Sequence, residues 1–400
     1  LFRMNGAESS FIKTLEGVSS PERLVADEIC RGYAELPVDN RAFLPPIFQS
    51  VSYSLPTVEA WEAFLCGARP AFGYSSDSNP TVAALEEMLA RLQGTEAALV
   101  TSTGKGAIGV ALFALLKADD HVVLLQEGYK STRILVQETL ARFNVRSTML
   151  SVEQLDTLDE LLARERTALV VIESPTNPIT RVVDIRAISD CAHRHGALLA
   201  LDNSLAGFHN HHGLGVDLYL HSLSKYVTGV GDVMGGAVLG CAELVKLIRR
   251  RSVFHIDTLD PVVARQMITG LHTYHLRIRA QCASALRIAE WLEQDGRVAR
   301  VMYPGLRSHP DHEIAVHQMQ DFTPVLAFEV KGDEAAMKRV LNALRRFRIA
   351  FGTGYTASIA GPTWLFYARS FPEPQRGVGA ITKSSIRLSI GVEEPSLLIE

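Results

Sequence analysis

Short apolar runs alternate with segments of helical periodicity between residues 81 and 220, and this alternation constrains the fold more than any other feature of the chain. The apolar runs have the length and composition of buried strands. We expect strands at 97–100, 121–125, 146–150, 168–172, 197–201 and 218–220. Helical patterns occupy 81–92, 107–116, 153–165 and 184–195. Strands and helices that alternate at this spacing predict an α/β fold with a doubly wound, mostly parallel sheet.

Candidate binding residues follow these strands, where each strand ends. Gly104 follows the first strand, Tyr129 the second and Asn177 the fourth, while Asp202 ends the fifth and Lys225 follows the sixth. In sheets of this kind, ligands bind beyond the carboxyl ends of the strands. We therefore expect all five residues at one edge of the sheet, in a single site.

The lysine at 225 lies in the stretch from His221 to Gly236, after an apolar run and before several glycines. A lysine amine in a partly dry pocket can have a pKa low enough for Schiff-base chemistry. Ser222 and Ser224 flank it, and small hydroxyl side chains suit phosphate oxygens. Together, the lysine, hydroxyls and glycines indicate pyridoxal phosphate (PLP) as the cofactor.

Other interpretations of the same stretch have less support. An isolated S-x-S-K would most simply be a surface lysine before a glycine turn. The S-x-x-K of acyl-serine enzymes has the companions S-D-N and K-T-G, and neither string occurs in the chain. Glycines 229, 231 and 235 resemble a dinucleotide loop, but their spacing is one residue too long and no acidic partner follows at the expected distance.

Three further positions have the chemistry that PLP requires. Asp202 ends an apolar strand, where a buried carboxylate needs a cationic partner such as a pyridinium nitrogen; a helix cap or turn is the alternative. The small-residue turn 101–106 precedes a helix, which predicts an anion site for the phosphate. Arg387, in a mostly apolar strand, suits a bidentate grip on a substrate carboxylate, with a structural salt bridge as the alternative.

Composition and charge limit the possible partners. The 400 residues are 47% hydrophobic and 21% charged, enough for two domains, and the net charge of −4 implies no nucleic-acid or membrane-surface partner. No apolar run approaches the roughly 20 residues that span a bilayer, and the first residues lack a signal-peptide pattern. Five scattered cysteines form no disulfide framework, which favours the cytoplasm.

Neither the cysteines nor the histidines predict a metal centre. Histidines 209, 211 and 212 have no partner four residues away and no cysteine nearby. We expect them on a solvated loop and predict no metal ligand in the chain.

The chain divides into three expected parts. Residues 1–60 look like an arm that lies on another surface, and 61–260 form the large domain. Beyond Asp260-Pro261, helical and strand patterns intermix, which predicts a smaller α+β domain at 261–400.

A set of motifs, in a fixed order along the chain, makes the chain resemble one known family. They are Tyr74-Ser75, Asn79-Pro80-Thr81, Thr103-Gly104, Tyr129, Glu173 to Pro178, Asp202-Asn203, Ser222 to Tyr226, Gly235-Gly236, Tyr303 to Leu306 and Arg387 to Gly391. From about residue 45 to the C-terminus, the chain resembles the Cys/Met-metabolism family of PLP enzymes, which includes cystathionine γ-synthase, cystathionine γ- and β-lyases and methionine γ-lyase.

This resemblance implies a fold-type I subunit with a seven-stranded sheet, a small amino-acid substrate and a homotetramer of dimers that share active sites. It also implies roles for individual residues. Lys225 forms the Schiff base and moves protons, Asp202 pairs with the pyridinium, and Tyr129 stacks on the ring. Tyr74 reaches in from the neighbouring subunit. Phosphate and substrate contacts are implied for Gly104, Lys105 (by its backbone), Ser222, Ser224, Asn177 and Arg387.

The chain departs from the family at positions that bear on the substrate. The family usually has an arginine where this chain has Ser76, so one phosphate contact is lost or supplied elsewhere. A methionine is usual at Lys105, and glycines are usual at 130 and 131. The polar residue and serine that face the distal end of the substrate are replaced by Ile349 and Ala350, followed by Phe351.

An apolar wall at 349–351 argues against recognition of the distal amino acid of cystathionine. We therefore predict a γ-elimination lyase for an L-amino acid with an uncharged or non-standard side chain. The family chemistry runs through α-proton removal, a quinonoid, β-proton removal and a vinylglycine-type intermediate. Three alternatives stay open: γ-replacement, β-elimination, and a PLP-binding protein without turnover.

Overall fold

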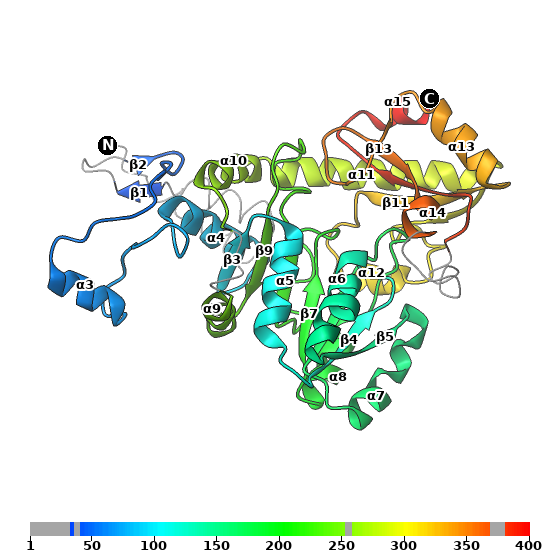
Figure 1. Cartoon of the computed structure of the whole chain (residues 1–400). Helices are drawn as coiled ribbons and strands as arrows, with labels where there is room; N and C mark the ends of the chain where they lie inside the picture. The colour runs from blue at the N-terminus through cyan, green and yellow to red at the C-terminus, as the bar shows by residue number, and fades with distance from the viewer. Residues whose placement is uncertain (1–32, 36–40, 253–257, 369–380) are drawn as a thin grey trace, which may run out of the picture.

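A seven-stranded sheet and a five-stranded sheet, both flanked by helices, make up most of the computed structural model, and a two-stranded sheet lies in the arm (Figure 1). It describes residues 33–35, 41–252, 258–368 and 381–400. Much of the expected arm, 1–60, lies outside the described residues, as does Cys30. In the described part of the arm, β1 (Tyr33–Glu35) pairs with β2 (Arg41–Ala42), and α3 (Val58–Leu65) projects from the rest of the chain (Figure 1).

The large sheet has seven strands. They are β3 (Ala97–Thr101), β4 (His121–Leu125), β5 (Arg146–Leu150), β6 (Leu169–Glu173), β7 (Leu198–Asp202), β8 (Leu218–Ser222) and β9 (Gly236–Gly240). Their order is β3-β9-β8-β7-β6-β4-β5. The five strands from β8 to β5 are parallel, whereas β9 is antiparallel to both of its neighbours. This confirms the predicted mostly parallel sheet of seven strands.

Strand β9 is not among the strands that the apolar pattern predicts. Only three apolar residues lie between its terminal glycines, so the segment resembles a glycine-rich loop. Close approach explains the glycines: a Cβ at Gly236 would lie 2.3 Å from the Thr103 carbonyl oxygen, and one at Gly240 would lie 2.5 Å from that of Asp217. The first glycine brings β9 against the turn before α5 (Gly104–Leu115).

Helices cover both faces of this sheet, which confirms the doubly wound arrangement. One face packs against α4 (Pro80–Gln93), α7 (Leu158–Arg164), α8 (Ile185–Arg194), α10 (Pro261–Leu271) and α11 (Tyr274–Gln294). The other face packs against α5, α9 (Ala242–Arg251) and the helical segments η1 (Leu135–Thr139) and η2 (Leu140–Phe143), which follow α6 (Lys130–Ile134). Along β3, Ala98 and Val100 pack on the face that α4 covers, and Leu99 packs on the face that α5 covers, because successive side chains of a strand point to opposite faces. No helix of the described ranges is long and apolar enough to cross a membrane.

The smaller sheet has five strands, in the order β10-β11-β14-β13-β12. They are β10 (Val298–Met302), β11 (Val325–Val330), β12 (Arg348–Ile349), β13 (Ile359–Pro362) and β14 (Ser385–Ser389). With it lie α11, α12 (His312–Gln318), α13 (Glu334–Ala343), α14 (Thr363–Ala368) and α15 (Pro395–Ile399). The expected α+β composition is confirmed. The boundary at 260 stays a prediction, because α10 begins there yet packs Met267 and Ile268 into the core of the large sheet.

The expected solvated loop for histidines 209, 211 and 212 is wrong. His209 and His211 are buried, and His212 is partly buried. Each ring finds a partner: His209 Nδ1 lies 3.0 Å from the Tyr274 hydroxyl, His211 Nδ1 donates to Asn203 at 2.7 Å, and His212 bonds to a backbone carbonyl. These partners are distant in sequence or set by the turn, so the local pattern does not reveal the burial.

Candidate active site

Lys225, Asp202 and Arg387 interact at the carboxyl edge of the large sheet. Asp202 is the last residue of β7, and Lys225 lies three residues after the end of the parallel neighbour β8. Burial lowers the pKa of Lys225, the charge of Arg387 lowers it further, and the charge of Asp202 opposes both. A lysine with a lowered pKa is more often unprotonated and is available as a nucleophile.

Asp202 lies beside a second buried carboxylate, Glu173, its register partner on β6. The Ser204 N–H donates to Asp202 Oδ1 at 3.1 Å. Burial raises the pKa of Asp202, and burial together with the charge of Asp202 raises the pKa of Glu173 well above its usual range. A cation is needed to stabilise an ionised carboxylate here. A protonated ring nitrogen facing Asp202 would supply it.

The turn before α5 forms an anion site against the end of β8. Thr103 caps the helix by accepting the N–H of Gly106 at 2.9 Å. Among the described residues, none accepts from the N–H groups of Gly104 and Lys105, so two first-turn donors and the helix dipole face outward. A Cβ at Gly104 would lie 2.8 Å from the Cβ of Ser222, so only glycine permits this approach.

The two serines that flank the lysine are placed differently. The Ser222 side chain faces Gly104 at the anion site. The Ser224 hydroxyl instead accepts the N–H of Gly235 at 3.0 Å and lies 3.3 Å from the carbonyl oxygen of the same residue. In this structure, Ser224 therefore holds the glycine segment before β9 against the lysine loop.

Arg387 connects the two sheets at the site. It is buried in β14, and its Nη1 donates to Asn177 Oδ1 at 3.1 Å, on the loop after β6. Its Nη2 donates to the Gly352 carbonyl at 2.6 Å. The planar guanidinium is thus oriented by the loop after β6 and by the segment after β12, which would suit a bidentate carboxylate site.

The segment that follows Gly352 packs directly on the lysine. The Ser389 hydroxyl accepts the N–H of Gly354 at 3.1 Å and bonds to the Thr353 hydroxyl at 2.8 Å. Gly354 has φ of 86°, and a Cβ there would lie 2.7 Å from the carbonyl carbon of Lys225. The small sheet therefore positions both Arg387 and the backbone of the lysine.

The remaining predicted residues lie in three places. Tyr129 is 37% exposed and lines a small cavity with Glu173 and Asp202, which places it at the site. Ile349 and Ala350 lie just before Gly352, at the edge of the small sheet. Tyr74 lies on the segment next to the arm, paired with Ser52, and no described contact joins it to Lys225 of the same chain.

With this geometry in place, comparison with known proteins is decisive. A family model described as Cys/Met metabolism PLP-dependent enzyme matches residues 30–400. The chain belongs to this family. It is 36% identical over 351 residues to O-succinylhomoserine sulfhydrylase of Pseudomonas aeruginosa, covering 87% of each chain. It is 33% identical over 353 residues to L-methionine gamma-lyase of Fusobacterium nucleatum subsp. polymorphum, covering 87% of this chain and 89% of the relative.

A solved member of the family has the same fold. The cystathionine gamma synthase of Xanthomonas oryzae pv. oryzae, crystallised with aminoacrylate and cysteine, superposes with a TM-score of 0.86 at 31% identity and covers 96% of both chains. Relatives therefore include lyases, sulfhydrylases and synthases. Family membership establishes PLP-dependent elimination or replacement chemistry on amino acids, but not one substrate.

The site residues of this Cys/Met-metabolism enzyme fit PLP, its cofactor. Lys225 has an amine with a lowered pKa, which could bind the cofactor, and the buried carboxylate of Asp202 would face the ring nitrogen. The first turn of α5 beside Ser222 would supply donors for the phosphate. When bound, PLP withdraws electrons from the substrate Cα and stabilises the negative charge left by proton removal.

Glu173 and Gly354 are not among the residues for which the sequence predicts a role. Glu173 ends an apolar strand, so the signal that identified Asp202 applied to it as well. Gly354 carries no such signal, because its importance comes from contact with a lysine far away in the chain.

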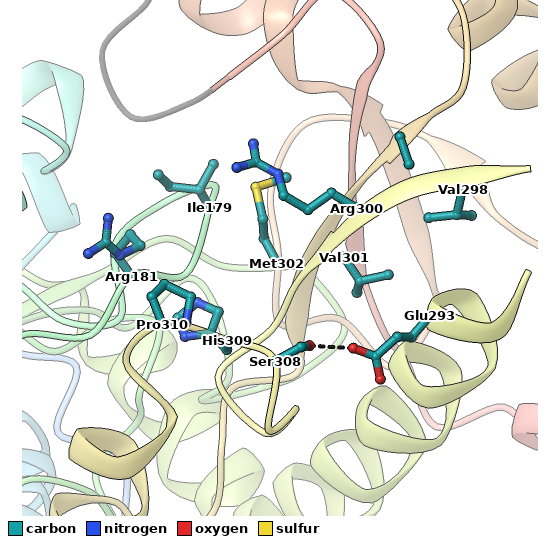
Figure 2. Close-up of a pocket in the computed structure, with 11 residues that line it drawn as sticks. Ile179, Arg181, Glu293, Val298, Arg300, Val301, Met302, Ser308, His309 and Pro310 are labelled. Atoms are coloured by element: carbon teal, nitrogen blue, oxygen red, sulfur yellow. Dashed lines mark hydrogen bonds between the residues drawn. The ribbon is translucent and has the colours of Figure 1, made fainter.

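A separate cavity of about 320 Å³ lies beside β10 and contains none of the predicted site residues (Figure 2). The side chains that line it include Ile179, Arg181, Met302 and His309. On the side of the cavity away from Arg181, the Ser308 hydroxyl donates to Glu293. Two of these side chains come from the loop that also carries Asn177. The cavity is therefore near the site in sequence but is not the site itself.

Proposed function

We propose that the chain is a γ-elimination lyase, which expels a γ-substituent from an L-amino acid with an uncharged or non-standard side chain. The apolar segment Ile349-Ala350-Phe351 carries the proposal. It directly precedes Gly352, which binds Arg387, and Ile349 and Phe351 are 56% and 79% exposed. Such a surface offers no charged partner to the distal amino acid of cystathionine, and it suits a compact apolar group.

The proposed roles follow from position. Arg387 binds the substrate α-carboxylate, assisted by Asn177. The Lys225 amine, with its lowered pKa, takes the α-proton and delivers or removes protons at Cβ. Tyr129, beside Asp202, stacks on the ring and assists departure of the γ-group.

The proposal includes a cytoplasmic homotetramer built from dimers. Exposed apolar side chains on and near the arm support a subunit contact: Phe43, Val51, Val58 and Leu65. Tyr74 follows this segment, and it would complete the site of a neighbouring subunit.

The second candidate is γ-replacement, which the sulfhydrylase relative favours. Replacement shares every step up to loss of the γ-group and then adds a thiol. β-Elimination and cofactor binding without turnover are further alternatives. All four differ in what happens at Cα, Cβ and Cγ, so a single measurement separates them.

The deciding experiment is proton NMR of the PLP-loaded enzyme in deuterium oxide with methionine, O-succinylhomoserine and cystathionine, each with and without an added thiol. Without thiol, we expect deuterium at Cα and Cβ of the remaining substrate, loss of the γ-group and formation of a 2-oxo acid. These changes should be most rapid with methionine. Product formed only with thiol would establish replacement. Exchange at Cα alone would indicate β-chemistry or a site without turnover. Lys225→Ala should abolish all exchange, and persistent turnover in that variant would contradict the role of Lys225.

A further inference from the structure

Three side chains of metal-binding types meet between α7 and α8. Asp159 is in the first turn of α7, Cys191 lies in α8, and His195 follows the last residue of α8. His195 lies three residues before β7 begins, so the group is at the amino edge of the large sheet, whereas Lys225 lies beyond the carboxyl edge. One ligand atom of each side chain lies within 4.8 Å of the other two.

These side chains converge on one oxygen. Asp159 Oδ1 lies 3.5 Å from Cys191 Sγ and 3.1 Å from His195 Nε2, and it also accepts from Arg194 Nη2 at 2.8 Å. Cys191 lies in α8 and His195 is the residue that caps the end of the same helix four positions later, so the two side chains lie on the same side of α8. The backbone of one helix therefore sets two of the three positions.

The spacing suits a single small ion. Zinc bonds of about 2.3 Å to sulfur and about 2.0–2.1 Å to nitrogen and oxygen, in a tetrahedral arrangement, place ligand atoms about 3.3–3.6 Å apart. The distances of 3.5 Å and 3.1 Å from Asp159 Oδ1 are close to this range. A thiolate and an imidazole favour zinc over calcium or magnesium, which prefer oxygen ligands.

We propose that Asp159, Cys191 and His195 form a Zn²⁺ site that joins α7 to α8, with solvent as the fourth ligand. On binding, the Cys191 thiol gives up its proton to solvent and the His195 ring coordinates through Nε2, with its proton on Nδ1. The ion takes the place of the hydrogens on Cys191 Sγ and His195 Nε2, which now point at Asp159 Oδ1. Because it binds only the folded arrangement of two helices, it stabilises the folded protein.

Arg194 supplies a specific internal test. Its guanidinium occupies the same carboxylate oxygen, and its side chain is largely exposed, so it competes with the ion without being a ligand. Removing its charge should therefore strengthen metal binding. If the cluster were only an ion pair between Asp159 and Arg194, removing the arginine charge would not strengthen metal binding.

The experiment is a Co²⁺ titration of the untagged holoenzyme, followed by the visible d–d bands of a tetrahedral thiolate complex, with Zn²⁺ as competitor. Loss of an outer-shell partner alone costs about 10–100-fold in affinity, so Cys191→Ala and His195→Gln should each weaken binding at least about 10-fold. Arg194→Gln should strengthen it. His193→Gln is the matched control on the same helix, because His193 pairs with Asp217, and it should leave affinity unchanged.

Zinc should also raise the unfolding temperature of wild type and of the His193 control, but not that of the Cys191 or His195 variants. Equal Co²⁺ binding in wild type and Cys191→Ala would overturn the proposal and point to another ligand, such as the exposed Cys66 or Cys241. Absence of tetrahedral bands in wild type at millimolar Co²⁺ would overturn it as well.

Discussion

Arg387 and Asn177 are 210 positions apart, and their side chains form a hydrogen bond of 3.1 Å. The arginine belongs to β14 of the small sheet, and the asparagine follows β6 of the large sheet. A second bond, to Gly352, holds the other end of the guanidinium. The guanidinium is thus held in one orientation, and in its proposed role as the carboxylate partner little of the binding energy would be needed to order it.

Arg387→Gln should raise KM for the amino-acid substrate about 10- to 100-fold, because hydrogen bonds to a charged group contribute about 1.5–3 kcal/mol. It should also raise the pKa of Lys225, since the charge of Arg387 lowers it. Steady-state kinetics and the pH dependence of PLP binding to the apoenzyme check both effects. Asn177→Ala keeps the guanidinium charge, so it should raise KM without moving the pKa of Lys225; an unchanged KM in Arg387→Gln would contradict the carboxylate role.

Gly354→Ala should lower kcat and cofactor retention. Its Cβ would lie 2.7 Å from the carbonyl carbon of Lys225, so the lysine backbone must shift. Gly94→Ala is the matched control: its φ of 71° resembles the 86° of Gly354, but a Cβ there meets nothing within 4 Å. Both variants should lose about 1–2 kcal/mol of stability from the left-handed backbone. Equal activity of the two in turnover assays would show that contact with the lysine is unimportant.

Ser76→Arg should tighten PLP retention if the family's arginine contact with the phosphate is what this chain has lost. A guanidinium adds a charge-assisted pair to an anion site now formed by backbone N–H groups at the start of α5. Dialysis of the holoenzyme followed by cofactor absorbance measures the off-rate. Ser76→Gln, which adds length without charge, should leave retention unchanged. A similar PLP affinity in wild type and Ser76→Arg would argue against this explanation.

Acid should destabilise the folded protein below about pH 6.5. Burial lowers the pKa of His211 and of His221 from 6.5 to about 3. Between these values the unfolded chain binds protons that the folded chain does not, so stability is full above pH 6.5 and falls as pH falls. At pH 5 the loss is about 2 kcal/mol per histidine.

Denaturant titrations at pH 7 and pH 5, at fixed protein concentration, measure this loss. His221→Asn should reduce the difference between the two pH values, even if it lowers stability at both. His317→Asn, at an exposed position, should leave the difference unchanged. An equal difference in wild type and His221→Asn would rule out the buried ring as its source.

Local patterns carried much of the fold. The six apolar runs all appear as strands, and Asp202 ends β7 as expected, because strand burial and turn chemistry are encoded within a few residues. The order of the motifs was enough to indicate the family, which the comparisons confirm. The catalytic and binding roles of individual residues stay predictions.

What the sequence by itself determined is therefore six of the seven strands of the large sheet, the edge at which their ends meet, and the lysine and aspartate at that edge. Only the tertiary structure decided that β9 inserts between β3 and β8, that Arg387 meets Asn177, and that histidines 209 and 211 are buried. The physical reason is separation along the chain. Periodicity reports which face of an element is apolar, whereas close approach and partners for buried polar groups come from segments that only packing brings together.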